Sequence, residues 1–171
     1  MKFKLFIGVA LAIVFLTVWY LSPFGVKGAK FANAHLEAGG IQLGMSQQEV
    51  EDLLHETPVV QMGESKQFTN IFEKNGLQVE YDKNQAVRSI SLRQESYSAF
   101  GIRVGDKMRK PGQAGETFGL KMNRTFSQNG FLRYDGNGIQ LIVGSANPSY
   151  EKVEYITVSL DDGRYSDDVD Y

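Results

Sequence analysis

Three short sequence blocks occur twice in this chain of 171 residues, in the same order. The matching pairs are 40–44 with 101–105 (GIQLG, GIRVG), 72–79 with 134–141 (FEKNGLQV, YDGNGIQL), and 87–92 with 153–158 (VRSISL, VEYITV). The offsets between the members of a pair are 61, 62 and 66 positions. A shared order with nearly constant spacing predicts a duplicated structural unit.

The first copy carries clear local signals for a helix and a set of strands. Ser46 and Glu49 form a capping-box pattern, which predicts a helix over residues 47–56 that ends before Pro58. Asn75-Gly76 predicts a hairpin turn, because both residue types tolerate positive φ. We expect strands at 71–72 and 77–81, followed by a third at 86–92.

The second copy repeats the strand signals but not the helix signals. Strands are expected at 131–134, 139–143 and 152–160. Pro111, Gly112 and Gly115 occupy the region that corresponds to the helix of the first copy. Because proline and glycine disfavour a helix interior, we expect a short or irregular helix there.

The fold class predicted from these signals is α+β. It consists of an N-terminal transmembrane helix and two tandem units, each a helical segment packed on a three-stranded antiparallel β-meander. The predicted boundaries are a cytoplasmic stub and anchor at 1–30, unit 1 at 31–98, unit 2 at 99–160, and an acidic C-terminal tail at 161–171.

Residues 44–54 (GMSQQEVEDLL), the hairpin and residues 87–92 together resemble the SmpA/OmlA repeat. That repeat occurs in the small lipoprotein of the outer-membrane barrel assembly machine. In tandem, it is also similar to the β-lactamase inhibitor protein. The resemblance implies a helical hairpin on an antiparallel sheet. It also implies a role in binding proteins or stabilising envelope assemblies rather than in catalysis.

Residues 5–21 are 17 consecutive uncharged, mostly apolar residues. As a helix they would be about 26 Å long, close to the hydrocarbon thickness of a membrane. Lys2 and Lys4 favour a cytoplasmic N-terminus, with residues 31–171 on the other side of a cell membrane. A signal peptide cleaved near residues 32–34 (ANA) and a buried core helix are the alternatives.

The charge of the whole chain is nearly balanced, but its distribution is uneven. The net charge of −2 argues against a nucleic-acid ligand, and the absence of cysteine excludes disulfides and thiolate chemistry. The segment 101–133 contains seven basic and two acidic residues. The basic residues are Arg103, Lys107, Arg109, Lys110, Lys121, Arg124 and Arg133. They predict a surface for an anionic partner, with a solvated loop as the plainer alternative.

No pattern for catalysis or for cofactor binding is present in the sequence. His35 and His55 have no metal-ligand spacing, and there is no nucleophile-elbow motif. We therefore expect a non-enzymatic interaction module of the cell envelope, without metal or cofactor, that binds an unknown envelope or secreted protein.

Three alternatives stay open for the function. The first is an inhibitor or chaperone-like binder of a secreted enzyme, which would need an exposed aromatic face made from Phe72, Tyr81, Tyr134 and Tyr155. The second is a binder of an anionic cell-wall polymer, and the third is an envelope hydrolase. The tail at 161–171 is expected to be a solvated end.

Overall fold

The computed structural model describes residues 23–62, 68–128, 130–146, 149 and 151–161. Its helices are α2 (Pro23–Asn33), α3 (Gln47–Leu54) and α4 (Pro111–Phe118). Its strands are β1 (Leu36–Glu37), β2 (Val59–Met62), β3 (Phe68–Phe72), β4 (Leu77–Tyr81), β5 (Val87–Leu92), β6 (Ser98–Ala99), β7 (Ile102–Arg103), β8 (Lys121–Met122), β9 (Phe131–Gly136), β10 (Ile139–Gly144) and β11 (Tyr155–Leu160).

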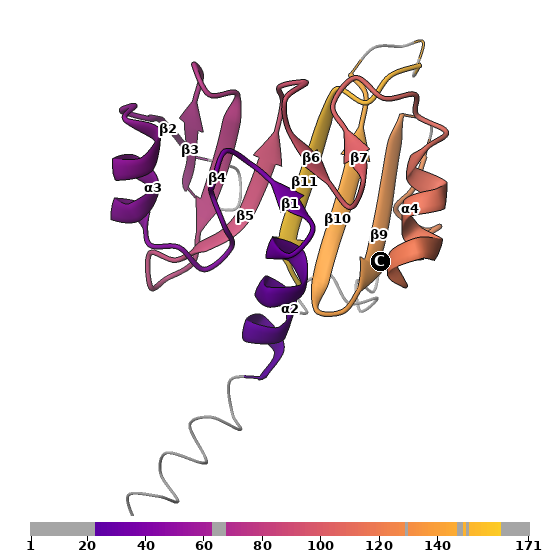
Figure 1. The fold of residues 1–171 in the computed structure, drawn as a ribbon, viewed down its shortest axis with the longest axis horizontal. Coiled ribbons are helices and arrows are strands. Elements are labelled where there is room, and N and C mark those ends of the chain that lie inside the picture. Colours follow the sequence, from indigo (N-terminus) through magenta and orange to yellow (C-terminus); the bar gives the residue numbers. More distant parts are fainter. Residues whose placement is uncertain (1–22, 63–67, 129, 147–148, 150, 162–171) are drawn as a thin grey trace, which may run out of the picture.

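Eight of these strands form one antiparallel sheet in the order β2-β3-β4-β5-β11-β10-β9-β8 (Figure 1). Strands β1, β6 and β7 form a small second sheet. The large sheet is joined at its centre by β5 and β11, where Ser91 lies opposite Thr157. Their hydroxyl oxygens are 2.6 Å apart and share a hydrogen bond. The two halves of the sheet are therefore one continuous hydrogen-bonded structure.

Matching backbone hydrogen bonds hold the loops of the two halves against the sheet. The N–H of Gly44 donates to the carbonyl of Val87 at 2.8 Å, and the N–H of Gly105 donates to the carbonyl of Val153 at 2.7 Å. Both glycines have positive φ, 90° and 94°. Such a backbone suits glycine, which has no Cβ to clash. The two halves therefore share a common backbone frame.

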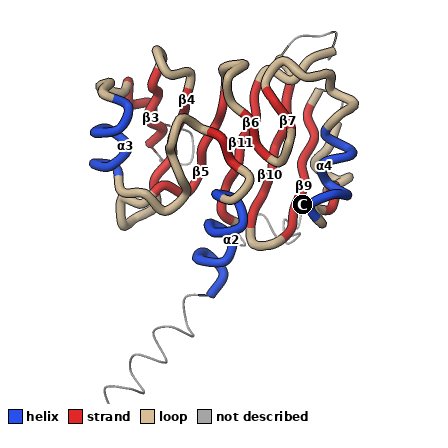
Figure 2. Tube along the Cα trace, in the orientation of Figure 1, coloured by secondary structure: helices blue, strands red, loops and turns tan. Residues whose placement is uncertain are grey.

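The core lies between the large sheet and the elements that cover one of its faces. Figure 2 shows α3, α2, the β1–β6–β7 sheet and α4 arranged along that face. Strand residues that alternate along β4, β5, β10 and β11 point into the core, as a half-buried strand requires. Val50 from α3, Ala32 from α2 and Ile102 from β7 meet them from the covering layer.

Helix α3 begins as the sequence predicts. The Ser46 side chain accepts a hydrogen bond from the N–H of Glu49, and the Glu49 carboxylate accepts one from the N–H of Ser46. The hydrogen bonds that the Glu49 carboxylate accepts, first from the Ser46 N–H and second from the Ser46 hydroxyl, lower the pKa of Glu49. The capping box is thus confirmed. The helix ends at Leu54, earlier than expected, because His55 takes the left-handed conformation at φ 50°.

Helix α4 is regular and as long as α3, eight residues each, in spite of its proline and glycines. Pro111 is its first residue, a position whose N–H has no partner within a helix, so the missing N–H of proline costs no hydrogen bond. Gly115 lies directly on the ring of Tyr134, so a Cβ there would be 2.9 Å from two ring carbons. The glycine that weakens the helix signal in the sequence therefore permits close packing of the helix on the sheet.

The turn between β3 and β4 differs from the predicted hairpin. Gly76 has positive φ, but Asn75 does not. The Asn75 side chain instead donates to the Glu56 carboxylate at 2.7 Å, which ties this turn to the segment after α3. In the second half, Asn137 and Gly138 do form a turn with two positive φ values, 53° and 76°.

The predicted fold class is wrong in two respects. The structure is mainly β, with sheets of eight and three strands and short helices, rather than α+β. The number of strands in each unit is also wrong, since each half supplies four strands, not three, to one shared sheet. The predicted strands correspond to β3, β4, β5, β9, β10 and β11, whereas the edge strands β2 and β8 and the pairing of β5 with β11 were not predicted.

The predicted transmembrane helix also requires correction. Among the described residues, no helix has the length and apolar character needed to cross a membrane. Residues 5–21, on which the prediction was based, lie outside the described residues. The signal-anchor interpretation and the predicted single-pass location, with a cytoplasmic N-terminus, depended on that helix and are withdrawn with it.

Candidate interaction surfaces

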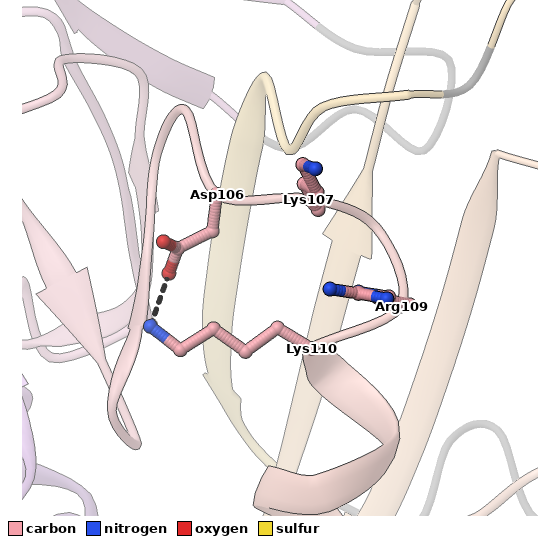
Figure 3. Close-up of a pocket in the computed structure, with 4 residues that line it drawn as sticks. All are labelled: Asp106, Lys107, Arg109 and Lys110. Carbon is pink, nitrogen blue, oxygen red and sulfur yellow. Dashed lines mark hydrogen bonds and ion pairs between the residues drawn. The ribbon is translucent and has the colours of Figure 1, made fainter.

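A hollow of about 580 Å³ lies at the loop between β7 and α4, lined by Asp106, Lys107, Arg109 and Lys110 (Figure 3). The Asp106 carboxylate organises this loop. It accepts hydrogen bonds from the Arg103 N–H and the Lys110 ammonium, both at 2.7 Å. Burial acts to raise the pKa of Asp106, but these hydrogen bonds and positive charges outweigh it and hold that pKa below its usual value.

Two cations at this hollow remain available to a ligand. Lys107 and Arg109 are exposed, whereas Lys110 is paired with Asp106. The described lining contains no hydroxyl, thiol or imidazole group. The arrangement is therefore suited to holding an anion by charge.

The starts of α3 and α4 differ in charge although their surroundings match. Ser46 forms an isolated bridge with Ala86, and Lys107, 61 positions later, forms the equivalent bridge with Lys152. Lys110 lies 61 positions after Glu49, so the second half has an ammonium group where the first half has the helix-capping carboxylate. Helix α4 has no acidic residue in its first turn. Cations are unfavourable near the positive end of a helix dipole, and the Asp106 carboxylate already offsets the charge of Lys110. A bound anion would therefore interact mainly with the exposed Lys107 and Arg109.

The predicted basic residues lie on separate elements. Arg103 is the last residue of β7, and Lys107, Arg109 and Lys110 lie on the loop that follows it, whereas Lys121 and Arg124 are exposed on and after β8. Arg133 is only 7% exposed. Its guanidinium pairs with Asp135 at 2.8 Å and lies over the Phe126 ring, 4.8 Å from the ring centre. Arg133 is thus a structural residue of the sheet.

The four predicted aromatic residues do not form an exposed face either. Phe72 and Tyr134 are core residues. Tyr155 is half-buried, and Arg93 lies over its ring at 5.5 Å. Tyr81 is also half-buried. Burial, followed by the charge of Glu51, raises the pKa of Tyr81 to about 12, while the Asn70 side chain acts in the opposite direction.

An exposed apolar edge that the sequence reasoning missed lies at the other end of the sheet. Strand β2 pairs with β3 on one side and is the last strand of the sheet on the other. Val59, Val60 and Met62 are 50%, 57% and 67% exposed, and Phe68 at the start of β3 is 55% exposed. The Val59-Val60 pair was the available signal, but no strand was predicted between the helix at 47–56 and the strand at 71–72.

The opposite edge of the sheet is built differently. Strand β8 has two residues, and one of them is the exposed Lys121. Short, charged edge strands discourage pairing with other chains. Strand β2 has four residues and no charge, so it lacks this protection.

The chain is thus a mainly β protein with an eight-stranded antiparallel sheet, one unprotected edge and one cationic loop. No protein-family model matches it, and no curated protein matches it. Among solved structures it is similar to an extracellular protein containing a SCP domain from Bacillus anthracis str. Ames. The TM-score is 0.54 at 6% identity, over 70% of this chain and 44% of that chain. This chain thus spans less than half of that protein, and the likeness shows the fold alone.

A second similar structure is a DUF4309 family protein from Bacillus subtilis subsp. subtilis str. 168. It gives a TM-score of 0.42 at 13% identity, over 80% of this chain and 95% of that chain. Neither protein belongs by name to the SmpA/OmlA proteins. The resemblance to that repeat therefore stays a prediction from sequence.

Proposed function

We propose that this protein is a non-enzymatic protein-interaction module, which binds an extended segment of another protein along strand β2. The observation that supports the proposal is the concentration of exposed apolar side chains on this edge, at Val59, Val60, Met62 and Phe68. An added strand would pair with the free backbone groups of β2 and cover these side chains. Burying each half-exposed side chain contributes roughly 1 kcal/mol.

The test compares substitutions at the two edges of the sheet. Val60→Lys places a charge on β2, and Met122→Lys is the matched control, because Met122 is an exposed apolar residue of β8. Proteins captured from cell extracts by the wild-type chain should be lost with Val60→Lys and kept with Met122→Lys. Equal capture by all three proteins would refute the proposal.

A second candidate function is the binding of an anionic polymer at the hollow beside α4. It is favoured by the exposed Lys107 and Arg109 at a helix start without its own acidic residue. In isothermal titration calorimetry with poly(glycerol phosphate), Lys107→Gln with Arg109→Gln should weaken binding, whereas Lys121→Gln should not. Affinity should also fall as salt rises. Binding that is insensitive to both changes would exclude this function for the hollow.

A further inference from the structure

The end of the sheet that contains β2 is acidic. Helix α3 and strands β2, β3 and β4 contain no lysine or arginine, and their acidic residues are Glu49, Glu51, Asp52 and Glu80. The turns and connections beside them add Glu56, Glu64, Glu73 and Asp82 against Lys66, Lys74 and Lys83. The surroundings of the uncharged strand are therefore strongly negative.

Carboxylates lie on both faces of this end of the sheet. Glu51 on α3 is near enough to Tyr81 for its charge to act on the phenol, which places it on the covered face. Glu80 lies on the opposite face, where its carboxylate accepts a hydrogen bond from the Thr69 hydroxyl at 3.4 Å. Thr69 in turn lies directly opposite Gln61 of β2. Gln61, Thr69 and Glu80 therefore lie in line across β2, β3 and β4, and a strand added to β2 would place one of its side chains at the end of this row.

The apolar side chains of the edge are concentrated on one face. Val60 is opposite Asn70, and Met62 is opposite Phe68, so Val60, Met62 and Phe68 share the face that α3 covers. Val59 and Gln61 point to the other face, where Val59 is in line with Ile71 and Gln78, and Gln61 is in line with Thr69 and Glu80. An added strand would therefore meet mainly apolar groups with one set of alternate residues, and with the other set a mixed face whose polar row ends in the carboxylate of Glu80.

We infer that the partner segment is a cationic β-strand, with apolar residues alternating with lysine or arginine. This inference rests on the proposed function and adds the chemistry of the partner. Charge complementarity favours such a segment over a second copy of the chain. Self-pairing of β2 would bring two acidic ends together, and like charges oppose association.

The test uses short labelled peptides and fluorescence anisotropy with the full-length protein. The first peptide alternates valine with lysine, and its matched controls alternate valine with threonine and valine with glutamate. We expect the lysine peptide to bind at least about tenfold more tightly than the glutamate peptide. Raising salt from about 50 mM to about 500 mM should reduce this preference, because exposed charges are screened.

Charge variants of the protein test which residues provide the preference. Glu51→Gln with Glu80→Gln keeps the side-chain acceptors for Gln47 and Thr69 but removes two charges. We expect about fivefold weaker binding of the lysine peptide and unchanged binding of the threonine peptide. Glu151→Gln is the matched control, since Glu151 is exposed and lies on the other half of the chain. It should leave both affinities unchanged.

The outcomes separate this inference from the proposed function. If the threonine and glutamate peptides bind as tightly as the lysine peptide, and Val60→Lys abolishes all three, the cationic partner is wrong and docking at β2 stands. If peptides N-methylated on alternate amides bind as tightly as unmodified ones, strand addition is wrong. A dimer in analytical ultracentrifugation that Val60→Lys dissociates would assign the edge to a second copy and overturn the inference.

Discussion

Two glycines of α4 provide a direct test of how this helix packs on the sheet. A Cβ at Gly115 would be 2.9 Å from two ring carbons of Tyr134 and 3.2 Å from the carbonyl oxygen of Leu120. Tyr134 is 1% exposed, so its ring has no free space to move into. A Cβ at Gly112, in the same helix, would meet nothing within 4 Å. The two substitutions to alanine therefore differ chiefly in packing.

The magnitudes follow from these distances. Replacing glycine by alanine in a helix stabilises it by roughly 0.5–1 kcal/mol, and Gly112→Ala should show this gain alone. Gly115→Ala has the same gain but forces an extra carbon into a filled core, which costs about 1–3 kcal/mol. We expect a difference of about 1–3 kcal/mol between the variants, or about 3–9 °C in melting temperature for a chain of this size.

The assay is thermal unfolding of the full chain followed by far-ultraviolet circular dichroism, repeated with urea. Gly112→Ala should melt above the wild type, and Gly115→Ala should melt below Gly112→Ala. Equal stabilisation by both substitutions would refute the packing of α4 on Tyr134. Near-ultraviolet dichroism provides a control, because a displaced Tyr134 ring changes the tyrosine signal while the far-ultraviolet spectrum is kept.

Two further predictions concern the sheet. The Ser91 and Thr157 hydroxyl oxygens share a hydrogen bond 2.6 Å long. A double-mutant cycle of Ser91→Ala and Thr157→Val, measured by urea unfolding, should give a coupling free energy of about 0.5–1.5 kcal/mol. The absence of coupling would contradict a direct bond. The second prediction concerns pH. Because the pKa of Tyr81 is raised to about 12 from the model-compound value of 10.0, this residue stabilises the fold fully below pH 10 and progressively less as pH rises toward 12. Tyr81→Phe should flatten the fall in unfolding free energy over that range, and an unchanged slope would show that Tyr81 ionises normally.

Local structure could be predicted from the sequence where neighbouring residues determine it. The capping box of Ser46 and Glu49 is an interaction over three residues, and the structure contains it. The alternation of Leu77, Val79 and Tyr81 identified β4 for the same reason. The regular α4 could not be predicted, because Gly115 is tolerated through a contact with Tyr134, a residue of another strand.

The candidate sites were harder to predict, because burial depends on distant pairing. Arg133 counted as a surface cation, yet its partner Asp135 is two residues away on the same strand and points to the same face. No strand was predicted at β2, because a segment of four residues is too short to show a clear strand period. Its position at the edge follows only from the order of all eight strands.

The two halves of the sheet share one backbone frame but differ in surface features, and these differences indicate where a partner binds. The common frame is fixed by equivalent bonds, such as those from Gly44 to Val87 and from Gly105 to Val153. Because this frame is the same in both halves, it does not account for the features that differ between them. These are the carboxylate or ammonium at the start of each helix and the apolar or charged strand at each edge. The exposed apolar residues of β2 and the exposed Lys107 and Arg109 before α4 are therefore the places where we expect a partner to bind.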